Sequence, residues 1–339
     1  MRILQCCAAQ IAIIQGFINF GFSRYMQVHR GLPRAIPGAS HVVTIGNFDG
    51  VHLGHQAILA QLCAAAGRFG VPSCVVTFEP HPREFFSPHA APTRLTSLRE
   101  KCELLEAHGV ARTQICRFDR GFAGMSADAF VERVLVAGLD TRWIMIGEDF
   151  RYGARRTGDF EHLTRKGRAA GFEVHAMPTV RSQDGSGDGA RVSSSGLREL
   201  LSAGDVERVQ ILLGRPYSIS GRIVHGDKIG RTLGFPTANV QLHHNRPPLT
   251  GIYAVLVAGI DAARLQGVAS MGVRPTVTGS GEMRLEVFLF DFERDIYGKH
   301  VRIDFLKKLR DEEKYRDLDT LKRQIARDCE DARAYFRQG

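Results

Sequence analysis

Short runs rich in β-branched residues alternate with longer runs of helical spacing from residue 41 to about residue 177. In the first helical run, Ile58, Leu62, Ala65 and Phe69 recur with a period close to 3.6, as on the buried face of a helix. Strand and helix alternate five times, which predicts a parallel sheet covered on both faces. The runs typical of strands are "HVVTIG", "CVVTF", "TQICRF", "WIMIG" and "FEVHAM".

Helix ends can be placed from their capping residues. Thr96 is expected to cap the helix in "LTSLREKCELLEAHG", which Gly109 would end, and Ser126 is expected to cap "SADAFVERVLVAG". A further helix is expected near residues 159–170. Ligands of such sheets bind beyond the carboxyl ends of the strands, so the polar segments after the strands are the candidate binding segments.

The pattern changes near residue 214. Strand-like runs then follow one another with turns between them, which predicts an antiparallel sheet or small barrel. Leu318, Leu321, Ile325 and Phe336 fall roughly on one face of a C-terminal helix. The strand-like runs are "YSISGRIV", "IYAVLVAGI", "RLQGVASMG", "RLEVFLFDF" and "HVRIDFLKKL". We therefore expect one domain over residues 26–213 and a second over residues 214–339.

The first 25 residues stand apart from both domains. Gln5, Gln10, Gln15 and Asn19 interrupt a moderately apolar run, whereas a membrane-spanning helix needs about 20 nearly continuous apolar residues. No convincing signal-peptide cleavage site follows, and Met26 opens an ordinary beginning. We expect residues 1–25 to be a poorly ordered extension. An amphipathic helix lying on a membrane is the alternative.

Composition narrows the class of protein. A hydrophobic content of 44% and a charged content of 24% over 339 residues are ordinary for a globular protein. The net charge of +9 is dispersed along the chain, so nucleic acid is not an expected partner. The seven cysteines include no C-x-x-C pair, which favours reduced thiols in a cytoplasmic protein over a zinc site or a disulfide framework.

The stretch "IGNFDGVHLGHQ", residues 45–56, joins the first strand to the first helix. A helix N-terminus presents unpaired N–H groups and a positive dipole end, so it receives phosphate well. Gly50 and Gly54 would allow close backbone approach, and His52 and His55 could donate to phosphate oxygens. This arrangement suits charge development on an α-phosphoryl group as pyrophosphate leaves. The alternative is a turn whose histidines satisfy local backbone groups.

A second dense stretch is "HGDKIGRTLGFPTANV", residues 225–240. Its glycines could form a loop over phosphates, and its basic residues could supply charge. A kinase needs Mg²⁺, phosphate positioning and a base near the attacking hydroxyl, and no Walker A motif is present. A glycine-rich loop alone is weak evidence for a kinase. The candidate residues are Gly226, Lys228, Gly230, Arg231, Gly234, Thr237 and Asn239.

The G-x-F-D-G-x-H-x-G-H pattern resembles the H-x-G-H signature of the nucleotidyltransferases, and in particular the FAD synthetase domain of bacterial bifunctional riboflavin kinase/FAD synthetases. "TFEPHPREFF", "GEDFRYG" and "VSSSGLR" match that family in order. The resemblance implies an α/β, Rossmann-like domain. It also implies that His52 and His55 bind the phosphates of ATP, with Asn47 and Asp49 nearby.

The same resemblance assigns two further groups of residues. Ser194, Ser195 and Arg198 would close on the triphosphate, although the family usually has threonine where Ser195 stands. A serine keeps the hydroxyl, and an arginine can brace a polyanion bidentately. The flavin or nucleotide pocket would be shaped by His81, Pro82, Phe85 and Arg151. Alternatively, His81 forms a rigid turn, Phe85 belongs to the core and Arg151 is a solvated surface charge.

The C-terminal region resembles the riboflavin kinase fold, a small antiparallel β-barrel. "LTGIYAV", "GVASMGVRPT" and the stretch from Glu286 to Tyr315 continue the match. The resemblance implies that Thr237 and Asn239 contact Mg²⁺ and ATP and that Glu286 accepts the proton of the ribityl 5′-hydroxyl. Strand alternation places Glu286 on the same face as Arg284 and Phe288. The alternative is a strand carboxylate that faces water.

The sequence therefore predicts a bifunctional enzyme. It would phosphorylate riboflavin to FMN and adenylylate FMN to FAD, with ATP as co-substrate, Mg²⁺ as cofactor and no membrane partner. Two alternatives remain: an enzyme with one active domain, or a flavin-binding regulator that contacts RNA.

Overall fold

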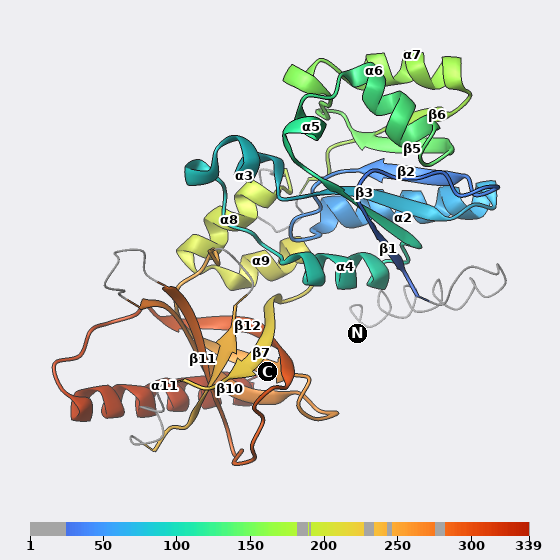
Figure 1. Cartoon of the computed structure of the whole chain (residues 1–339). Coiled ribbons are helices and arrows are strands. Elements are labelled where there is room, and N and C mark those ends of the chain that lie inside the picture. Colours follow the sequence, from blue (N-terminus) through green and yellow to red (C-terminus); the bar gives the residue numbers. More distant parts are fainter. Residues whose placement is uncertain are drawn as a thin grey trace. The chain divides into compact units, whose positions relative to one another are not determined.

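The computed structural model describes residues 25–181, 189, 191–226, 234–242, 246–274 and 282–338 (Figure 1). The chain divides into two compact units. Unit 1 comprises the chain up to Asn47, Ile58–Pro82 and Leu105–Pro178. Unit 2 comprises Phe48–Ala57, Arg83–Leu104 and the chain from Thr179 onward. The "FDGVHLGH" turn thus belongs to unit 2, although it connects elements of unit 1.

Unit 1 is built on a six-stranded sheet whose neighbouring strands are all parallel. The strand order is β1-β4-β3-β2-β5-β6. The strands are β1 (Gln27–Arg30), β2 (His41–Ile45), β3 (Ser73–Glu79), β4 (Arg112–Arg117), β5 (Thr141–Gly147) and β6 (Glu173–Met177). The five predicted strands are confirmed. β1 is an additional edge strand that sequence pattern missed, because its four residues are mostly exposed and carry no apolar run.

Helices cover the sheet of unit 1, as predicted (Figure 1). On one side, buried strand residues such as Val43 and Ile144 pack with Val134 and Leu163 in one apolar cluster. On α2, Leu62 and Ala65 are buried as expected, together with Leu59. The helices are α2 (Leu53–Phe69), α5 (Arg120–Ala123), α6 (Ala127–Phe130) continuing as η2 (Val131–Val136), η3 (Ala154–Arg156) and α7 (Phe160–Ala170). The side chain of Ser126 accepts from the N–H of Ala129, which confirms the predicted cap.

Unit 2 contains a closed antiparallel barrel with strand order β10-β11-β8-β7-β12-β9. Its strands are β7 (Tyr217–Val224), β8 (Thr237–Gln241), β9 (Gly251–Ala258), β10 (Leu265–Arg274), β11 (Glu282–Leu289) and β12 (His300–Arg310). The C-terminal helix α11 spans Leu318–Gln338. The predicted barrel and C-terminal helix are confirmed. β8 was missed, because "TANVQ" reads as a polar turn rather than as a strand.

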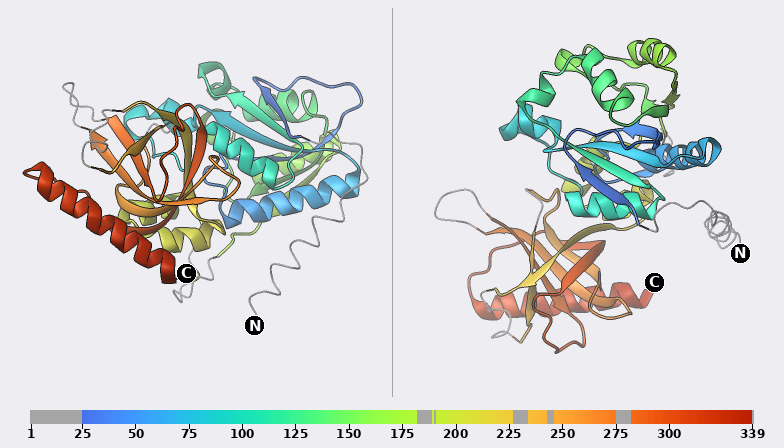
Figure 2. Two further views of the ribbon diagram at one scale, coloured as in Figure 1. Left: turned by 90° about the horizontal axis from the view of Figure 1, so that it is seen from below. Right: turned by 45° about the vertical axis from the view of Figure 1, so that its right-hand side comes forward.

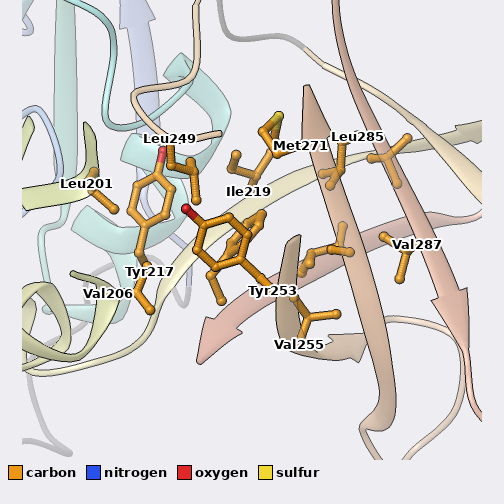
Figure 3. Close-up of a cluster of buried hydrophobic side chains, with 14 of the residues drawn as sticks. Leu201, Val206, Tyr217, Ile219, Leu249, Tyr253, Val255, Met271, Leu285 and Val287 are labelled. Carbon is orange, nitrogen blue, oxygen red and sulfur yellow. The ribbon is translucent and has the colours of Figure 1, made fainter. Parts of the chain in front are cut away.

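The barrel of unit 2 is filled by apolar side chains (Figure 3). The ring planes of Tyr253 and Phe305 meet almost at right angles, with centroids 5.4 Å apart. Leu201 and Val206, from the helices that precede β7, join the same cluster (Figure 3). Those helices are α8 (Ser194–Ala203) and α9 (Val206–Leu213). The barrel core therefore continues into α9 and into α8, the helix that carries Ser194 and Arg198.

One predicted cap is wrong. The remaining helices are α3 (Pro82–Phe86), η1 (Pro88–Ala90) and α4 (Leu98–Ala107). Helix α4 is capped by Ser97 rather than by Thr96. Ser97 and Glu100 form a capping box, in which each side chain accepts a hydrogen bond from the backbone N–H of the other. The sequence "TSLRE" has two adjacent hydroxyl residues, so the capping residue could not be chosen from sequence alone.

Figure 2 shows the same elements in two further views. Among the described residues, no helix has the length and apolarity needed to cross a membrane.

Candidate active sites

The backbone between β2 and α2 is strained. Phe48, Gly50 and Val51 have φ angles of 48°, 83° and 42°. A positive φ is rare for any side chain and unfavourable for a β-branched one, and such strain persists only where the surroundings enforce it. Phe48 and Val51 are buried, with 1% and 0% of their surface exposed. The turn Phe48–His55, here called the histidine turn, is therefore held in one shape by packing.

Asp49 organises the histidine turn. Its buried carboxylate accepts hydrogen bonds from the backbone N–H groups of Leu95 and Thr96 and from the Thr96 hydroxyl, at 3.0 to 3.1 Å. The guanidinium of Arg198 donates to the same carboxylate and also to the carbonyl of Thr93. Thr96, the residue expected to cap a helix, instead anchors this aspartate. Arg198 reaches the histidine turn as predicted, with part of its donor set committed to protein oxygens.

His52 and His55 lie face to face, with ring centroids 3.8 Å apart and planes 19° from parallel. The Nδ1 of His52 accepts from the backbone N–H of His55 at 3.3 Å, so the proton of the neutral ring is on Nε2. Burial lowers the pKa of His52 to about 4. Burial, with help from His52 and Lys101, holds the pKa of His55 well below its usual value. Both imidazoles are thus neutral donors near pH 7 rather than cations.

Several contacts brace the histidine turn. The Ser194 hydroxyl donates to the carbonyl of Asp49 at 2.9 Å, and Arg215 donates to the carbonyl of Gly50 at 2.8 Å. A Cβ on Gly54 would lie 3.1 Å from the ring of His52, which explains the glycine between the histidines. Ser195, the next residue after Ser194, is exposed at the start of α8. Sequence reasoning did not find Arg215, since nothing near it in the chain resembles a motif.

The His55 ring keeps one buried polar atom without a partner. Within the described residues, its Nδ1 makes no hydrogen bond. Buried polar atoms are nearly always paired, and exceptions are often found at sites that bind a ligand. The N-terminus of α2, which begins at Leu53, lies in the same segment. The arrangement offers imidazole and backbone N–H donors to an anion, as expected for phosphate.

The other residues predicted for the first site are distributed over both units. In unit 1, the Asn47 side-chain oxygen is buried and unpartnered within the described residues, and Arg151 is exposed. His81 and Pro82 lie at the start of α3, and Phe85 near its end packs edge-on against Phe86 at 5.2 Å. Phe85 is half-buried. These residues remain candidates for the flavin or nucleotide pocket.

A cavity of about 550 Å³ opens on the barrel of unit 2. Thr237 and Asn239 of β8 and Glu286 of β11 line it, as do Leu321 and Ile325 of α11. Arg284 and Phe288 line it as well, which confirms the face predicted from strand alternation. The cavity thus combines polar and apolar lining residues from the barrel with mostly apolar residues of the C-terminal helix. Such a combination suits a flat, partly apolar ligand with a polar tail.

Glu286 is held from two sides. Its Oε2 accepts from the hydroxyl of Thr237 at 3.2 Å, and its Oε1 pairs with the guanidinium of Arg284 at 3.0 Å. Asn239 is the cross-strand partner of Glu286 in the pairing of β8 with β11. The three predicted residues are therefore gathered at one end of the cavity. The carboxylate does not simply face water.

The predicted phosphate loop is only partly described. Lys228, Gly230 and Arg231 lie outside the described residues. At Gly226, an added Cβ would fall 2.1 Å from the amide nitrogen of Asn239, so glycine makes room for that side chain. Gly234 has a φ of 85° with open space around it.

Sequence reasoning missed the groups that fasten α11 to the cavity. Arg310 of β12 makes two hydrogen bonds of 2.7 Å with the carboxylate of Asp328 on α11. Glu312 also lines the cavity and accepts from the hydroxyl of Ser270 at 3.5 Å. Burial raises the pKa of Glu312. Each of these residues is far in sequence from its partner, so no local pattern announces them.

The oxygen atoms of the side chains near Asn239 are suitable ligands for Mg²⁺. Hydroxyl, amide and carboxylate oxygens are the ligands this hard cation prefers, and it usually keeps waters and substrate phosphates as further ligands. Among the described residues, no cluster of three or more histidine, cysteine or acidic side chains could hold a metal ion alone. Mg²⁺ at Thr237 and Asn239 would have waters and substrate phosphates as its further ligands.

Comparisons with known proteins match two consecutive parts of the chain to two family models. Residues 37–195 match the family model described as FAD synthetase, and residues 213–336 match the one described as riboflavin kinase. The bifunctional riboflavin kinase/FMN adenylyltransferase of Pseudomonas fluorescens is 48% identical over 91% of this chain and 97% of its own length. The protein of that name from Escherichia coli K12 is 44% identical over 88% of this chain and 94% of its own.

A solved structure extends the likeness to three dimensions. The crystal structure named as a macrolide-efflux protein from Streptococcus pneumoniae has a TM-score of 0.76 and 29% identity. It covers 89% of this chain and 97% of that one. From its two matched domains and its near-complete coverage of close relatives, the chain belongs to the bifunctional riboflavin kinase/FMN adenylyltransferase family.

Proposed function

We propose that this chain catalyses two ATP-dependent steps of flavin cofactor synthesis, each in its own domain. Riboflavin is phosphorylated to FMN in the barrel, and FMN is adenylylated to FAD with release of pyrophosphate at the histidine turn. The observation that carries this proposal is the presence of two separate polar clusters, one around Asp49 and one around Glu286. We assign residues 26–213 to the adenylyltransferase and residues 214–339 to the kinase.

In the kinase, Glu286 is the base that takes the proton from the ribityl 5′-hydroxyl as its oxygen attacks the γ-phosphorus of ATP. The hydroxyl of Thr237 and the guanidinium of Arg284 orient the carboxylate. The cavity of about 550 Å³ has room for the flavin beside the apolar residues of α11. Phosphoryl transfer depends mainly on positioning and electrostatic stabilisation, which fits a site with few reactive groups.

A divalent cation is part of this proposal. Mg²⁺ would be held by Thr237 and Asn239 with the phosphates of ATP, and it would neutralise their charge during transfer. Asn239 is well placed for this role, since it pairs with Glu286 across the two strands and Gly226 leaves room for its amide group. Gly226, Gly234 and the intervening Lys228, Gly230 and Arg231 would cover the phosphates.

In the adenylyltransferase, an oxygen of the FMN phosphate attacks the α-phosphorus of a second ATP, and pyrophosphate leaves. His52 and His55 donate to the phosphate oxygens as neutral imidazoles. Neutral donors in a buried turn stabilise the charge that develops in the transition state without holding the product pyrophosphate as tightly as cations would. Arg198, whose charge is balanced by Asp49, lies beside Ser194 and Ser195 at the start of α8 and would brace the triphosphate with its remaining N–H groups. Asn47, His81, Pro82, Phe85 and Arg151 are assigned to substrate contacts.

The cellular setting is the cytoplasm in this proposal. Both reactions consume ATP, and the five described cysteines form no disulfide.

One incubation tests the two activities together. The protein is mixed with riboflavin, ATP and Mg²⁺, and the flavins are separated by chromatography. The proposal expects FMN to appear first and FAD to follow. FMN without FAD, or conversion of supplied FMN alone, would leave one domain inactive. Riboflavin binding without any product would instead favour a flavin-binding regulator.

A further inference from the structure

A basic hollow lies on unit 1, apart from the residues assigned to either reaction. It has a volume of about 600 Å³ and is lined by residues 29–36, from the end of β1 and the segment after it, and by two residues of β4. Its cationic or imidazole members are His29, Arg30, Arg34 and Arg112. A second hollow of about 350 Å³ shares Arg112 and is also lined by His41. None of the residues that line either hollow is acidic.

Arg112 is the unusual member of this group. Only 3% of its surface is exposed, and charged side chains are seldom so buried unless they are paired with an opposite charge. Its guanidinium lies 3.2 Å from the Nε2 of His41 and donates to the Gln114 side-chain oxygen at 2.8 Å. Its Nε is buried and has no hydrogen-bond partner within the described residues. No ion pair of Arg112 is found in the described part of the chain.

The partners of Arg112 are themselves held in place and are neutral. The Nδ1–H of His41 donates to the carbonyl of Leu139 at 2.7 Å, which leaves Nε2 to accept from Arg112. Burial lowers the pKa of His41, so it adds no compensating or opposing charge at neutral pH. The Gln114 amide donates to the carbonyl of Gly31 at 2.8 Å. The guanidinium is therefore oriented by a rigid, uncharged frame.

The acid that acts electrostatically on His41 is committed elsewhere. Asp140 influences His41 electrostatically, but its carboxylate accepts from the hydroxyl of Ser40 and pairs with Arg142. A buried, oriented and uncompensated guanidinium stabilises the fold poorly, because its desolvation is not offset by an opposite charge. It is well suited to bind an oxyanion, for which its N–H groups form a planar donor set.

We propose that the hollow around Arg112 is a binding site for a small anion that carries phosphate groups. The guanidinium of Arg112, which lines the hollow, attracts the phosphate, and the exposed Arg30 and Arg34 supply further positive charge. Three guanidinium groups around a hollow of this size favour a ligand with more than one phosphate over a single carboxylate. The enzyme's own products offer two sources with this chemistry, inorganic pyrophosphate and ADP.

The test is calorimetric titration of the full-length chain with pyrophosphate and, separately, with ADP. The starting protein carries His52→Ala and His55→Ala, which removes the phosphate donors of the histidine turn. Arg112→Gln removes the charge of the buried guanidinium. Arg30→Ala with Arg34→Ala removes only exposed side chains and so decides the test if the Arg112 variant does not fold. The matched control is Arg165→Ala with Arg168→Ala, which removes two exposed arginines from α7.

The expected result is a pyrophosphate site that weakens about tenfold or more in the Arg112 variant and in the Arg30/Arg34 variant, since a charge-assisted bond contributes ~1.5–3 kcal/mol. The control should bind as the starting protein does. ADP also binds the barrel cavity in the proposed function, so ADP supports this site only where its binding weakens in the Arg112 and Arg30/Arg34 variants and not in the control. Pyrophosphate that does not bind at millimolar concentration, together with ADP binding that these variants leave unchanged, overturns the proposal. Equal weakening of anion binding in the Arg165/Arg168 control also overturns the proposal, because affinity would then depend only on the net charge of the chain.

Discussion

The histidine turn and the barrel cavity hold their polar groups in opposite ways. In the histidine turn, contiguous residues are buried and strained, and the pKa values of both histidines are lowered by burial. In the barrel cavity, the groups come from separate strands and a helix and surround a volume of about 550 Å³. In the proposed function, the first site is a preformed backbone turn that would meet phosphate with neutral donors. The second is a cavity in which the Glu286 carboxylate would meet the substrate hydroxyl.

This difference predicts that one substitution can silence either site alone. The largest expected effect is at Glu286. Glu286→Gln keeps size and polarity but removes the base, and general-base contributions are typically ~10²–10⁴-fold in rate. FMN formation from riboflavin should fall by that factor, measured by chromatography of the flavins.

The control for this variant is Glu293→Gln, at an exposed position after β11. The same preparation of the Glu286 variant should convert supplied FMN to FAD at the parental rate. Kinase turnover within a few-fold of the parent would mean that another group is the base. A parallel fall of both activities would mean that the two sites are coupled.

The reverse case is His55→Ala. Removing one donor that stabilises transition-state charge lowers the rate by roughly 10²–10³-fold. FAD formation from FMN should fall by that factor, while riboflavin phosphorylation continues in the barrel. His175→Ala serves as the control, because that histidine lies on the edge strand β6 and stacks on Trp143 of β5, away from the residues assigned to either reaction. Unchanged adenylylation in the His55 variant would return the two histidines to a local structural role.

The two sites also differ in how sequence reveals them. The histidine turn was predicted almost entirely, because its strand, glycines and histidines are consecutive and produce a recognisable spacing. In the barrel, Thr237, Asn239 and Glu286 were predicted through a family resemblance and strand alternation. Arg310, Asp328 and Glu312 were not, since only barrel closure and the return of α11 bring them to the cavity.

The fold shows the same division between local and distant information. Long apolar strands such as β3 and β7 were predicted within a residue or two of their ends. The edge strand β1 and the polar strand β8 were missed, because neither has an apolar run. Each is a strand only through its pairing with strands distant in sequence, β1 with β4 and β8 with β7 and β11. Thr96 was misassigned as a cap because its actual partner, Asp49, lies far away in the sequence. Arg215 and the strain at Val51 likewise depend on tertiary packing.

The buried state of His52 predicts a pH dependence of stability. A histidine whose pKa falls from 6.5 to about 4 on folding binds fewer protons when folded, so stability is lost as the pH falls from about 6.5 toward 4. The full effect is on the order of 3 kcal/mol. Thermal unfolding at several pH values should show a shallower acid limb for His52→Gln than for the parent. Superimposable pH profiles would mean that His52 is protonated in the folded chain.

The barrel cavity should depend on the ion pair that fastens its helical wall. Asp328→Asn leaves Arg310 without its bidentate partner. Breaking a buried pair costs ~3–5 kcal/mol, and partial exposure of Arg310 reduces this to roughly 2–3 kcal/mol. The melting temperature should fall and the KM for riboflavin should rise. Asp331→Asn, at an exposed position on the same helix, is the control. A normal KM in the Asp328 variant would mean that α11 does not shape the flavin site.

The smallest expected effect separates backbone strain from crowding in the histidine turn. Gly50 and Gly70 both have positive φ angles, 83° and 65°, but only Gly50 faces a neighbour, since an added Cβ would lie 2.9 Å from a methyl carbon of Leu95. Alanine at either position carries the backbone penalty of roughly 1 kcal/mol. Alanine at Gly50 should destabilise the chain by a further ~1–2 kcal/mol, because overpacking displaces Leu95. That displacement moves the backbone N–H that Leu95 donates to Asp49, so FAD formation should fall in Gly50→Ala and stay normal in Gly70→Ala. Equal melting temperatures and equal FAD formation in the two variants would show that the turn tolerates movement, and its rigidity would then not explain how it holds phosphate.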